Sequence, residues 1–272
     1  MPIALINGRV LREQTLVEGK CVLLEGERIL DIVPAGHASC RGATQIDLRG
    51  NMLLPGFVDS QVNGGGGVLF NDSPTVDSIR QIGRAHRRFG TTGFMPTLIS
   101  ADLDVVARAI TAARGAIDSG VPGVLGIHIE GPFLNVERKG VHDPAKLREL
   151  DTSAVGLLTS LGIGRTLVTL APEMTKPEII QKLAAAGVIV SAGHSNADYA
   201  EVVAALRHGL TGFTHLFNAM SQLSGREPGV VGAALESRDS WCGIIVDGQH
   251  ISPVVLRLAL RCKPSSRFML VT

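Results

Sequence analysis

Residues 124–135 read VLGIHIEGPFLN, and the rest of the chain repeats the pattern that this stretch sets. Its closely spaced apolar residues are typical of a buried β-strand, and the carboxylate of Glu130 follows them at a Gly-Pro pair that ends regular strand pairing. A charge at the end of a buried strand is costly unless a partner neutralises it. Two later apolar runs have the same form, because one ends at His194 and the other carries His215. The sequence therefore predicts one metal site, built from Glu130, His194 and His215 at the ends of three strands.

Apolar runs of strand length recur from residue 52 to the end of the chain, and helical patterns that close at a glycine lie between most of them. Continuous apolar strands that alternate with helices predict a parallel sheet covered by helices. Eight such runs favour a closed (β/α)8 barrel of the TIM type, with an open doubly wound sheet as the alternative. The expected strands are 52–59, 93–99, 124–129, 166–170, 188–192, 212–216, 242–246 and 267–272, and the expected helices are 76–89, 103–117, 177–186, 197–208 and 253–260.

Residues 1–52 differ from this pattern, since they hold only short β-like runs separated by turns such as Asn7-Gly8. We expect them to form a small β-sandwich portion that is incomplete on its own, because a few short strands make a poor core. The expected organisation is therefore a β domain over 1–52 and a barrel over 53–272.

Composition excludes several classes of function. The 26 basic and 25 acidic residues are spread along the chain and give a net charge of +1, which does not support binding to nucleic acid or to a membrane surface. No apolar run approaches the roughly 20 residues of a membrane helix, and the first residues lack the pattern of a signal peptide. The four cysteines form no CxxC pair, so we expect reduced thiols and a cytoplasmic location.

Each candidate residue also has a plainer interpretation when it is taken alone. Glu130 could accept hydrogen bonds from loop amides, His194 could be a turn residue, and His215 a core histidine. His128 lies two residues before Glu130 on the same strand face, so it could either approach the metal or pack in the interior. Three candidates at expected strand ends favour the metal site, since catalytic zinc commonly has three His or carboxylate ligands.

The chain resembles the N-acetylglucosamine-6-phosphate deacetylase family of the amidohydrolase superfamily. The stretches that carry the resemblance run in family order through nearly the whole chain, and together they are highly specific. They are PGFVDSQVNG (55–64), GIHIEGPFLN (126–135), KGVHDP (139–144), TLAPE (169–173), SAGHSNA (191–197), THLFNAM (214–220), GREPG (225–229) and DGQHI (247–251).

The resemblance implies that Glu130, His194 and His215 hold one divalent metal ion per subunit, with zinc favoured over iron or cobalt. Many members of the superfamily bind a second metal through a His-x-His pair, but this chain has Gln61 and Asn63 there. Neutral amides are poor zinc ligands, so the resemblance implies a single metal, with Gln61 and Asn63 on the substrate side.

The resemblance also assigns roles in binding and catalysis. His142 would donate a hydrogen bond to the acetamide carbonyl as it becomes an oxyanion, while Asn218 and the Ala219 backbone orient the substrate. Arg226 and His250 would bind the 6-phosphate, reaching into the site of the neighbouring subunit, which implies a homodimer. On local grounds alone, Arg226 is equally well explained as a solvated loop residue.

The implied reaction is metal-assisted hydrolysis of N-acetylglucosamine 6-phosphate to acetate and glucosamine 6-phosphate, a step in amino-sugar catabolism or recycling. The family's general acid/base is an aspartate directly after a Leu-Val-Thr sequence, and this chain reads Leu270-Val271-Thr272 and stops. We therefore expect this 272-residue form to lack the aspartate and the last barrel helix, and to be nearly inactive. The alternatives are an amidohydrolase that acts on a different amide and a non-catalytic sugar-phosphate-binding barrel.

Overall fold

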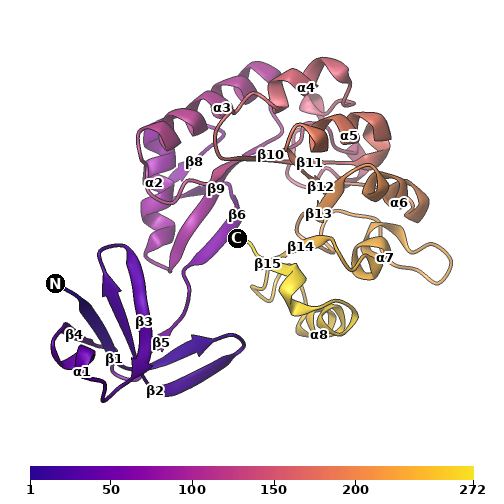
Figure 1. Ribbon diagram of the computed structural model, residues 1–272. Coiled ribbons are helices and arrows are strands. Elements are labelled where there is room, and N and C mark those ends of the chain that lie inside the picture. Colours follow the sequence, from indigo (N-terminus) through magenta and orange to yellow (C-terminus); the bar gives the residue numbers. More distant parts are fainter. The chain divides into compact units, whose positions relative to one another are not determined.

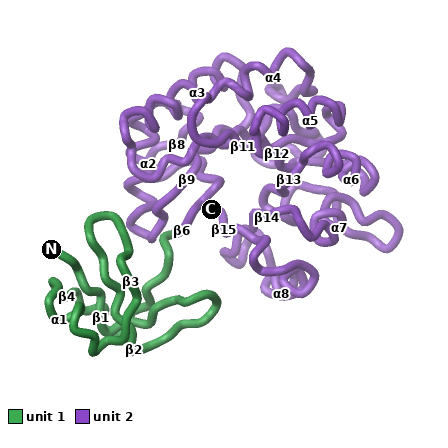
Figure 2. The backbone as a smooth tube through the Cα atoms, viewed as in Figure 1, with its two compact units in different colours: residues 1–56 green, residues 57–272 purple.

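The computed structural model describes all residues, 1–272, which form two compact units, residues 1–56 and residues 57–272 (Figure 2). The division into domains 1–52 and 53–272 stays a prediction, because compactness does not show which part folds alone. None of the helices combines the length and the apolar character that a membrane crossing requires.

The first unit is a mixed five-stranded sheet with the order β3-β2-β1-β4, in which β5 also pairs with β1. Strand β1 runs antiparallel to β2 and parallel to β4 and β5. A small core of five buried residues supports it: Ala4, Cys21, Leu23, Val33 and Cys40. Its elements are β1 (Ile3–Arg12), β2 (Thr15–Glu25), β3 (Arg28–Pro34), α1 (Ala38–Arg41), β4 (Thr44–Asp47) and β5 (Met52–Leu53).

The second unit is the expected parallel barrel, with the strand order β6-β9-β10-β11-β12-β13-β14-β15 and helices on its outer side (Figure 1). The strands are β6 (Phe57–Val62), β9 (Thr91–Ile99), β10 (Gly126–Glu130), β11 (Arg165–Leu170), β12 (Ile189–Ala192), β13 (Leu210–Phe213), β14 (Trp241–Ile244) and β15 (Phe268–Leu270). The helices are α2 (Val76–Arg87), α3 (Leu103–Asp118), α4 (Thr152–Leu158), α5 (Pro177–Ala185), α6 (Tyr199–Arg207), α7 (Gly229–Glu236) and α8 (Pro253–Cys262). The short elements are the hairpin β7 (Gly64–Gly65) and β8 (Val68–Leu69), and the 3-10 turns η1 (Val136–Arg138), η2 (Pro144–Lys146), η3 (Pro172–Met174) and η4 (Ser265–Arg267).

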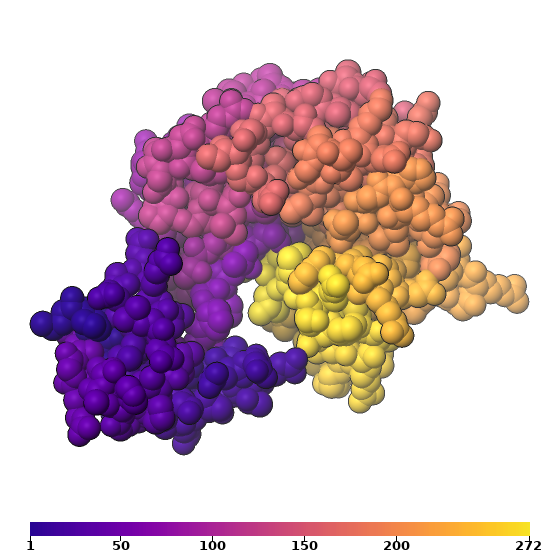
Figure 3. Space-filling model, in the orientation of Figure 1, coloured from indigo at the N-terminus to yellow at the C-terminus, as the bar shows by residue number.

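The barrel is nearly closed where its first and last strands meet. The hydroxyl of Thr272, just after β15, donates to the buried carboxylate of Asp59 on β6 at 2.7 Å. Burial raises the pKa of Asp59, although hydrogen bonds from the Gln61 amide and Thr272 lower it in part. The colours of the space-filling view change gradually through this unit, so segments that follow one another in the sequence lie side by side (Figure 3).

Four expectations about the elements need correction. The expected strand 52–59 is two strands, β5 and β6, because Pro55 lacks the N–H that a continuous ladder needs. Helix α6 begins after Asp198, which forms a capping box with Glu201, and not after Asn196. Strand β13 ends at Phe213, so His215 lies beyond it in a turn. The helices α4 and α7 had not been expected, since α4 is short and α7 is apolar on all sides.

Candidate metal centre

The predicted ligands Glu130, His194 and His215 converge at the carboxyl ends of the barrel strands. Glu130 is the last residue of β10, while the two histidines stand two residues beyond the ends of β12 and β13. All three side chains are buried, and they form the group of residues that could hold a metal ion. In barrels of this type the active site lies on this face, so the three residues stand where a functional site is expected.

The three candidate ligand atoms form a nearly equilateral triangle. The Nε2 atom of His194 lies 3.1 Å from Glu130 Oε1, the Nε2 atom of His215 lies 2.9 Å from the same oxygen, and the two nitrogens are 3.0 Å apart. Ligand atoms about 2.0–2.1 Å from a tetrahedral zinc ion are roughly 3.3 Å from one another. If the three distances between these atoms grew by a few tenths of an ångström, they would match those around a tetrahedral zinc ion.

Hydrogen bonding shows why this triangle fits a metal cation. The Nδ1 atom of His194 lies 2.7 Å from the backbone oxygen of Arg138, which can only accept, so Nδ1 carries the proton. In neutral His194, Nε2 therefore presents a lone pair towards the carboxylate of Glu130. Lone pairs facing one another in a buried site repel unless a positive charge lies between them, so the donor set fits a divalent metal ion.

Glu130 is ionised, as a carboxylate that binds a metal ion must be. Burial raises the pKa of Glu130, but without a metal the rings of His194 and His215 can carry a proton on Nε2, and hydrogen bonds from them hold the pKa of Glu130 well below its usual range. The Nε2 atom of Gln61 lies 3.3 Å from both carboxylate oxygens and donates to them. Glu130 is therefore ionised and held in one orientation.

His142 lies beside the cluster, with its ring centroid 4.4 Å from that of His194. The backbone N–H of Ser100 donates to His142 Nδ1 at 3.2 Å, and the Ser100 hydroxyl lies 2.7 Å from the same nitrogen. Because Nδ1 accepts, the proton of neutral His142 must be on Nε2. Burial lowers the pKa of His142 to about 4, so the ring is neutral near pH 7. It therefore offers one N–H donor beside the candidate metal centre.

Two buried histidines predict that acid destabilises the metal-free protein. Burial lowers the pKa values of His128 and His142 from 6.5 to about 4, so between these values the unfolded chain binds more protons than the folded one. The free energy of unfolding should fall as the pH drops through this window, by on the order of 3 kcal/mol for each histidine. Glu130 adds to the fall at the lower end of this window, because its pKa in the unfolded chain is the ordinary one, near 4.5, and its pKa in the folded chain is well below it.

Urea unfolding of metal-stripped protein across this pH range measures the effect. His128→Gln should remove about one proton from the slope. A free energy of unfolding that does not change with pH would contradict the burial of these two rings.

A cavity of about 910 Å³ opens over the cluster. It is lined by most of the residues for which we expected a role in substrate binding, namely Gln61, Asn63, His142, Asn218, Ala219 and His250. His250 is exposed, and its Nδ1 atom lies 2.8 Å from the carboxylate of Asp247. Arg226 is exposed in the loop before α7 and does not line the cavity.

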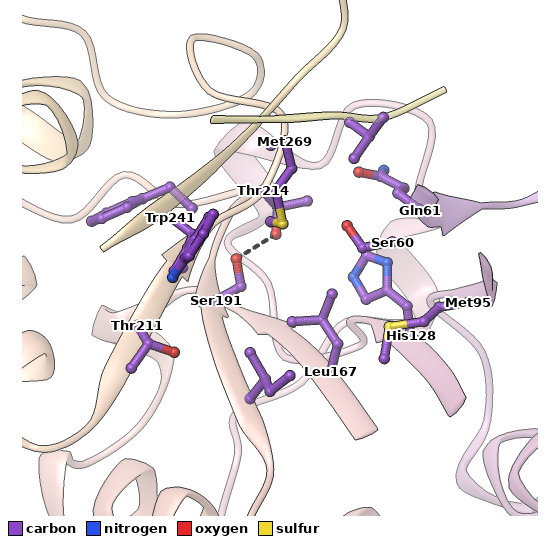
Figure 4. A pocket seen from close by; sticks show the side chains of 15 residues that line it. Ser60, Gln61, Met95, His128, Leu167, Ser191, Thr211, Thr214, Trp241 and Met269 are labelled. Atoms are coloured by element: carbon purple, nitrogen blue, oxygen red, sulfur yellow. Dashed lines mark hydrogen bonds between the residues drawn. The ribbon is translucent and has the colours of Figure 1, made fainter. Parts of the chain in front are cut away.

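His128 lies in a second cavity, of about 280 Å³, inside the barrel (Figure 4). Gln61 lines both cavities, but the lining of the second is mostly apolar. The two ring nitrogens of His128 lie 3.2 Å from the hydroxyl of Thr97 and 2.7 Å from that of Thr169. With both nitrogens hydrogen-bonded, His128 is an interior packing residue, which was one of the two interpretations left open by the sequence.

The backbone is strained at both candidate histidine ligands, His194 and His215. The φ angles of His194 and His215 are +50° and +33°, and those of Phe217 and Ala219 nearby are also positive. Residues other than glycine rarely adopt such conformations, which cost on the order of 1–3 kcal/mol each and persist where the surroundings hold them. Strain of this kind clusters at functional sites, so it supports a function for this face.

Sequence reasoning missed three residues that fix the site. Ser100 sets the tautomer of His142, the Arg138 carbonyl sets that of His194, and Glu173 binds the loop that carries His194. A backbone carbonyl gives no sequence signal, because every residue has one. Ser100 directly follows an expected strand, and Glu173 stands in the TLAPE stretch, so both could have been noticed by position.

A parallel barrel with two imidazoles and a carboxylate at the carboxyl ends of its strands defines the class of metal-dependent barrel proteins. The model of the amidohydrolase family matches residues 52–267. This chain therefore belongs to the amidohydrolase family.

Two proteins of similar sequence and one solved structure are more specific matches than the family model. An N-acetylgalactosamine-6-phosphate deacetylase of Shewanella sp. (strain ANA-3) is 49% identical over 225 residues, which cover 83% of this chain and 57% of the relative. An N-acetylglucosamine-6-phosphate deacetylase of Haemophilus influenzae is 40% identical over 264 residues, covering 97% and 69%. The crystal structure of N-acetylglucosamine-6-phosphate deacetylase from Pasteurella multocida matches with a TM-score of 0.94 at 36% identity, covering 100% of this chain and 71% of that one. The chain thus spans 57% to 69% of the length of these two sequence relatives.

Proposed function

We propose that the protein containing this chain hydrolyses the N-acetyl group of an amino-sugar 6-phosphate, releasing acetate and the free amine. N-Acetylglucosamine 6-phosphate, which gives glucosamine 6-phosphate, is the first candidate substrate. The observation that carries the proposal is the triangle of Glu130, His194 and His215 beneath a cavity into which the N–H of His142 can donate. The names of the relatives supply the substrate class.

In this proposal, Glu130, His194 and His215 hold one zinc ion. Zinc, when bound, supplies Lewis acidity that polarises the amide carbonyl and acidifies water. Side chains of the protein stabilise the developing charge and hold the substrate. His142 donates from Nε2 to the carbonyl oxygen as negative charge develops there, while Gln61 keeps Glu130 oriented. Asn63, Asn218 and the Ala219 backbone hold the sugar against this centre.

Binding of the 6-phosphate involves a second subunit in this proposal. Arg226 is exposed and does not line the cavity of its own chain, so a role in binding the 6-phosphate requires a second copy of the protein. His250 does line the cavity and would share the phosphate. We therefore propose a homodimer in which Arg226 acts at the neighbouring site.

The resemblance assigns proton transfer to an aspartate that directly follows the Leu-Val-Thr sequence of the family. In this chain that sequence ends at Thr272, and Thr272 lines the cavity. This assignment stays a prediction. The cytoplasmic location likewise stays a prediction from the four free cysteines.

A second candidate substrate follows from the comparisons, because the relative at 49% identity is named for N-acetylgalactosamine 6-phosphate. The two sugars differ only in configuration at C4. We expect the protein to release acetate from at least one of the two phosphorylated sugars, and much more slowly from the same sugar without phosphate.

Acetate release from the two phosphorylated sugars, from unphosphorylated N-acetylglucosamine and from a cyclic amide tests the proposal, together with metal analysis of the purified protein. About one zinc per chain and a preference for a phosphorylated sugar are expected. Equal rates with and without phosphate would favour an amidohydrolase with another substrate. A folded protein that retains no metal would favour a non-catalytic barrel.

A further inference from the structure

The TLAPE stretch, residues 169–173, has no role in the proposed chemistry, yet its last residue lies at the centre of a hydrogen-bond network. Glu173 stands in η3, directly after β11. Its carboxylate accepts from the Ser195 hydroxyl at 2.7 Å, from the Asn196 backbone N–H at 2.6 Å and from the Asn135 amide at 3.0 Å. All three donors are neutral, and they belong to the loops on either side of β11, one after β10 and one after β12.

These two loops, residues 135–138 and 194–196, are also bound directly to each other. The Asn135 N–H donates to the carbonyl of His194 at 3.0 Å. The Arg138 guanidinium donates to the Asn196 side-chain oxygen at 3.0 Å, and the Asn196 amide donates to Glu137 at 3.0 Å. We call residues 135–138 and 194–196, together with Glu173, the loop clamp.

The loop clamp surrounds the strained residue of the metal centre. His194 has a φ of +50°, a conformation that persists only where neighbouring structure holds it. The two residues that follow it, Ser195 and Asn196, are the ones that Glu173 binds. The ring of His194 is in turn oriented by the Arg138 carbonyl, which belongs to the other loop. Glu173 therefore fixes both the backbone and, through the loops, the ring of one ligand.

We propose that Glu173 is a positioning residue of the metal centre, which it serves through the loop clamp without touching metal or substrate. It does not line the cavity over Glu130, His194 and His215. The inference rests on the proposed function only in assuming that these three residues bind zinc. Outer partners that orient metal ligands typically change metal affinity about 10–100-fold when they are replaced.

The hydrogen bonds of Glu173 predict different effects for its replacement by glutamine and by alanine. Oε1 of Glu173 accepts both N–H donors, and Oε2 accepts the Ser195 hydroxyl. Glu173→Gln keeps an oxygen for the two N–H donors, and its amide can donate to the Ser195 hydroxyl. Glu173→Ala removes every acceptor. We therefore expect the dissociation constant for zinc to rise about 10–100-fold in Glu173→Ala and less than about tenfold in Glu173→Gln.

The experiment measures zinc binding to the metal-stripped full chain by competition with a chromophoric chelator, and the melting temperature of each metal-free variant. Asp151→Ala is the matched control, because Asp151 caps α4 by accepting from the Ser153 N–H at 2.8 Å. The control should lower the melting temperature and leave zinc affinity unchanged. A residue with a merely structural role would behave like the control.

Unchanged zinc affinity in a folded Glu173→Ala variant would overturn the inference, and so would equal losses in the alanine and glutamine variants. If Glu173→Ala does not fold, Ser195→Ala decides by the same measurement. It removes one donor to Glu173 and should weaken zinc binding, and unchanged affinity there overturns the inference. Failure of the unsubstituted chain to bind zinc would instead overturn the proposed metal centre.

Discussion

Replacing His194 by alanine is expected to abolish the stabilisation of this protein by zinc. The three ligand atoms of the centre lie within 3.1 Å of one another, so none of them is redundant. At a free zinc concentration about 1,000 times the dissociation constant, binding to the native state stabilises it by about 4 kcal/mol. For a chain of this size that corresponds to roughly 10 °C in melting temperature.

Thermal unfolding with zinc and with a chelator measures this difference. In the unsubstituted chain, the chelator should remove the whole zinc-dependent rise in melting temperature. In His194→Ala, zinc should not raise the melting temperature, so the chelator should have no effect. His208→Ala serves as the control, since that histidine is half-buried at the end of α6, where its ring forms a hydrogen bond with the Ala204 carbonyl. A full zinc-dependent shift in His194→Ala would mean that the metal binds elsewhere.

Replacing His142 by alanine should lower the rate of acetate release about 10²–10³-fold, the loss typical of one donor to a developing oxyanion. The donor acts only in the transition state, so kcat and kcat/KM should fall together while KM changes little. The pKa of His142 is about 4, so activity should show no titration of this residue near neutral pH. The assay uses the whole protein and the better of the two phosphorylated sugars.

His142→Gln is the matched variant, because its amide can still donate, and it should recover part of the loss. Zinc affinity must be measured in parallel, since the rings of His142 and His194 are in contact. An unchanged rate in His142→Ala, with zinc still bound, would remove this residue from the mechanism.

The sequence predicted the barrel and the convergence of the three candidate ligands, because each of them stands at or near the end of an apolar run and parallel strands bring such ends together. Glu130, His194 and His215 could therefore be named without knowledge of their distances. It could not predict that His215 lies beyond β13 in a left-handed turn, because backbone strain at a single residue depends on contacts made by distant segments. Nor could it predict the tautomers of His142 and His194, which depend on the Ser100 N–H and the Arg138 carbonyl.

The order in which the ligands appear along the chain has a consequence for resistance to proteolysis. Glu130 and His194 are 64 residues apart, and His194 and His215 are 21 apart, so one ion bound by all three would bridge three strand ends and close two loops at once. Because the ion binds the folded chain, it must be released before the segment that it bridges can unfold. The segment from β10 to the turn after β13 should therefore resist a protease only while it is loaded, whereas the small sheet of residues 1–56, which contributes no ligand, should be cleaved equally in either state.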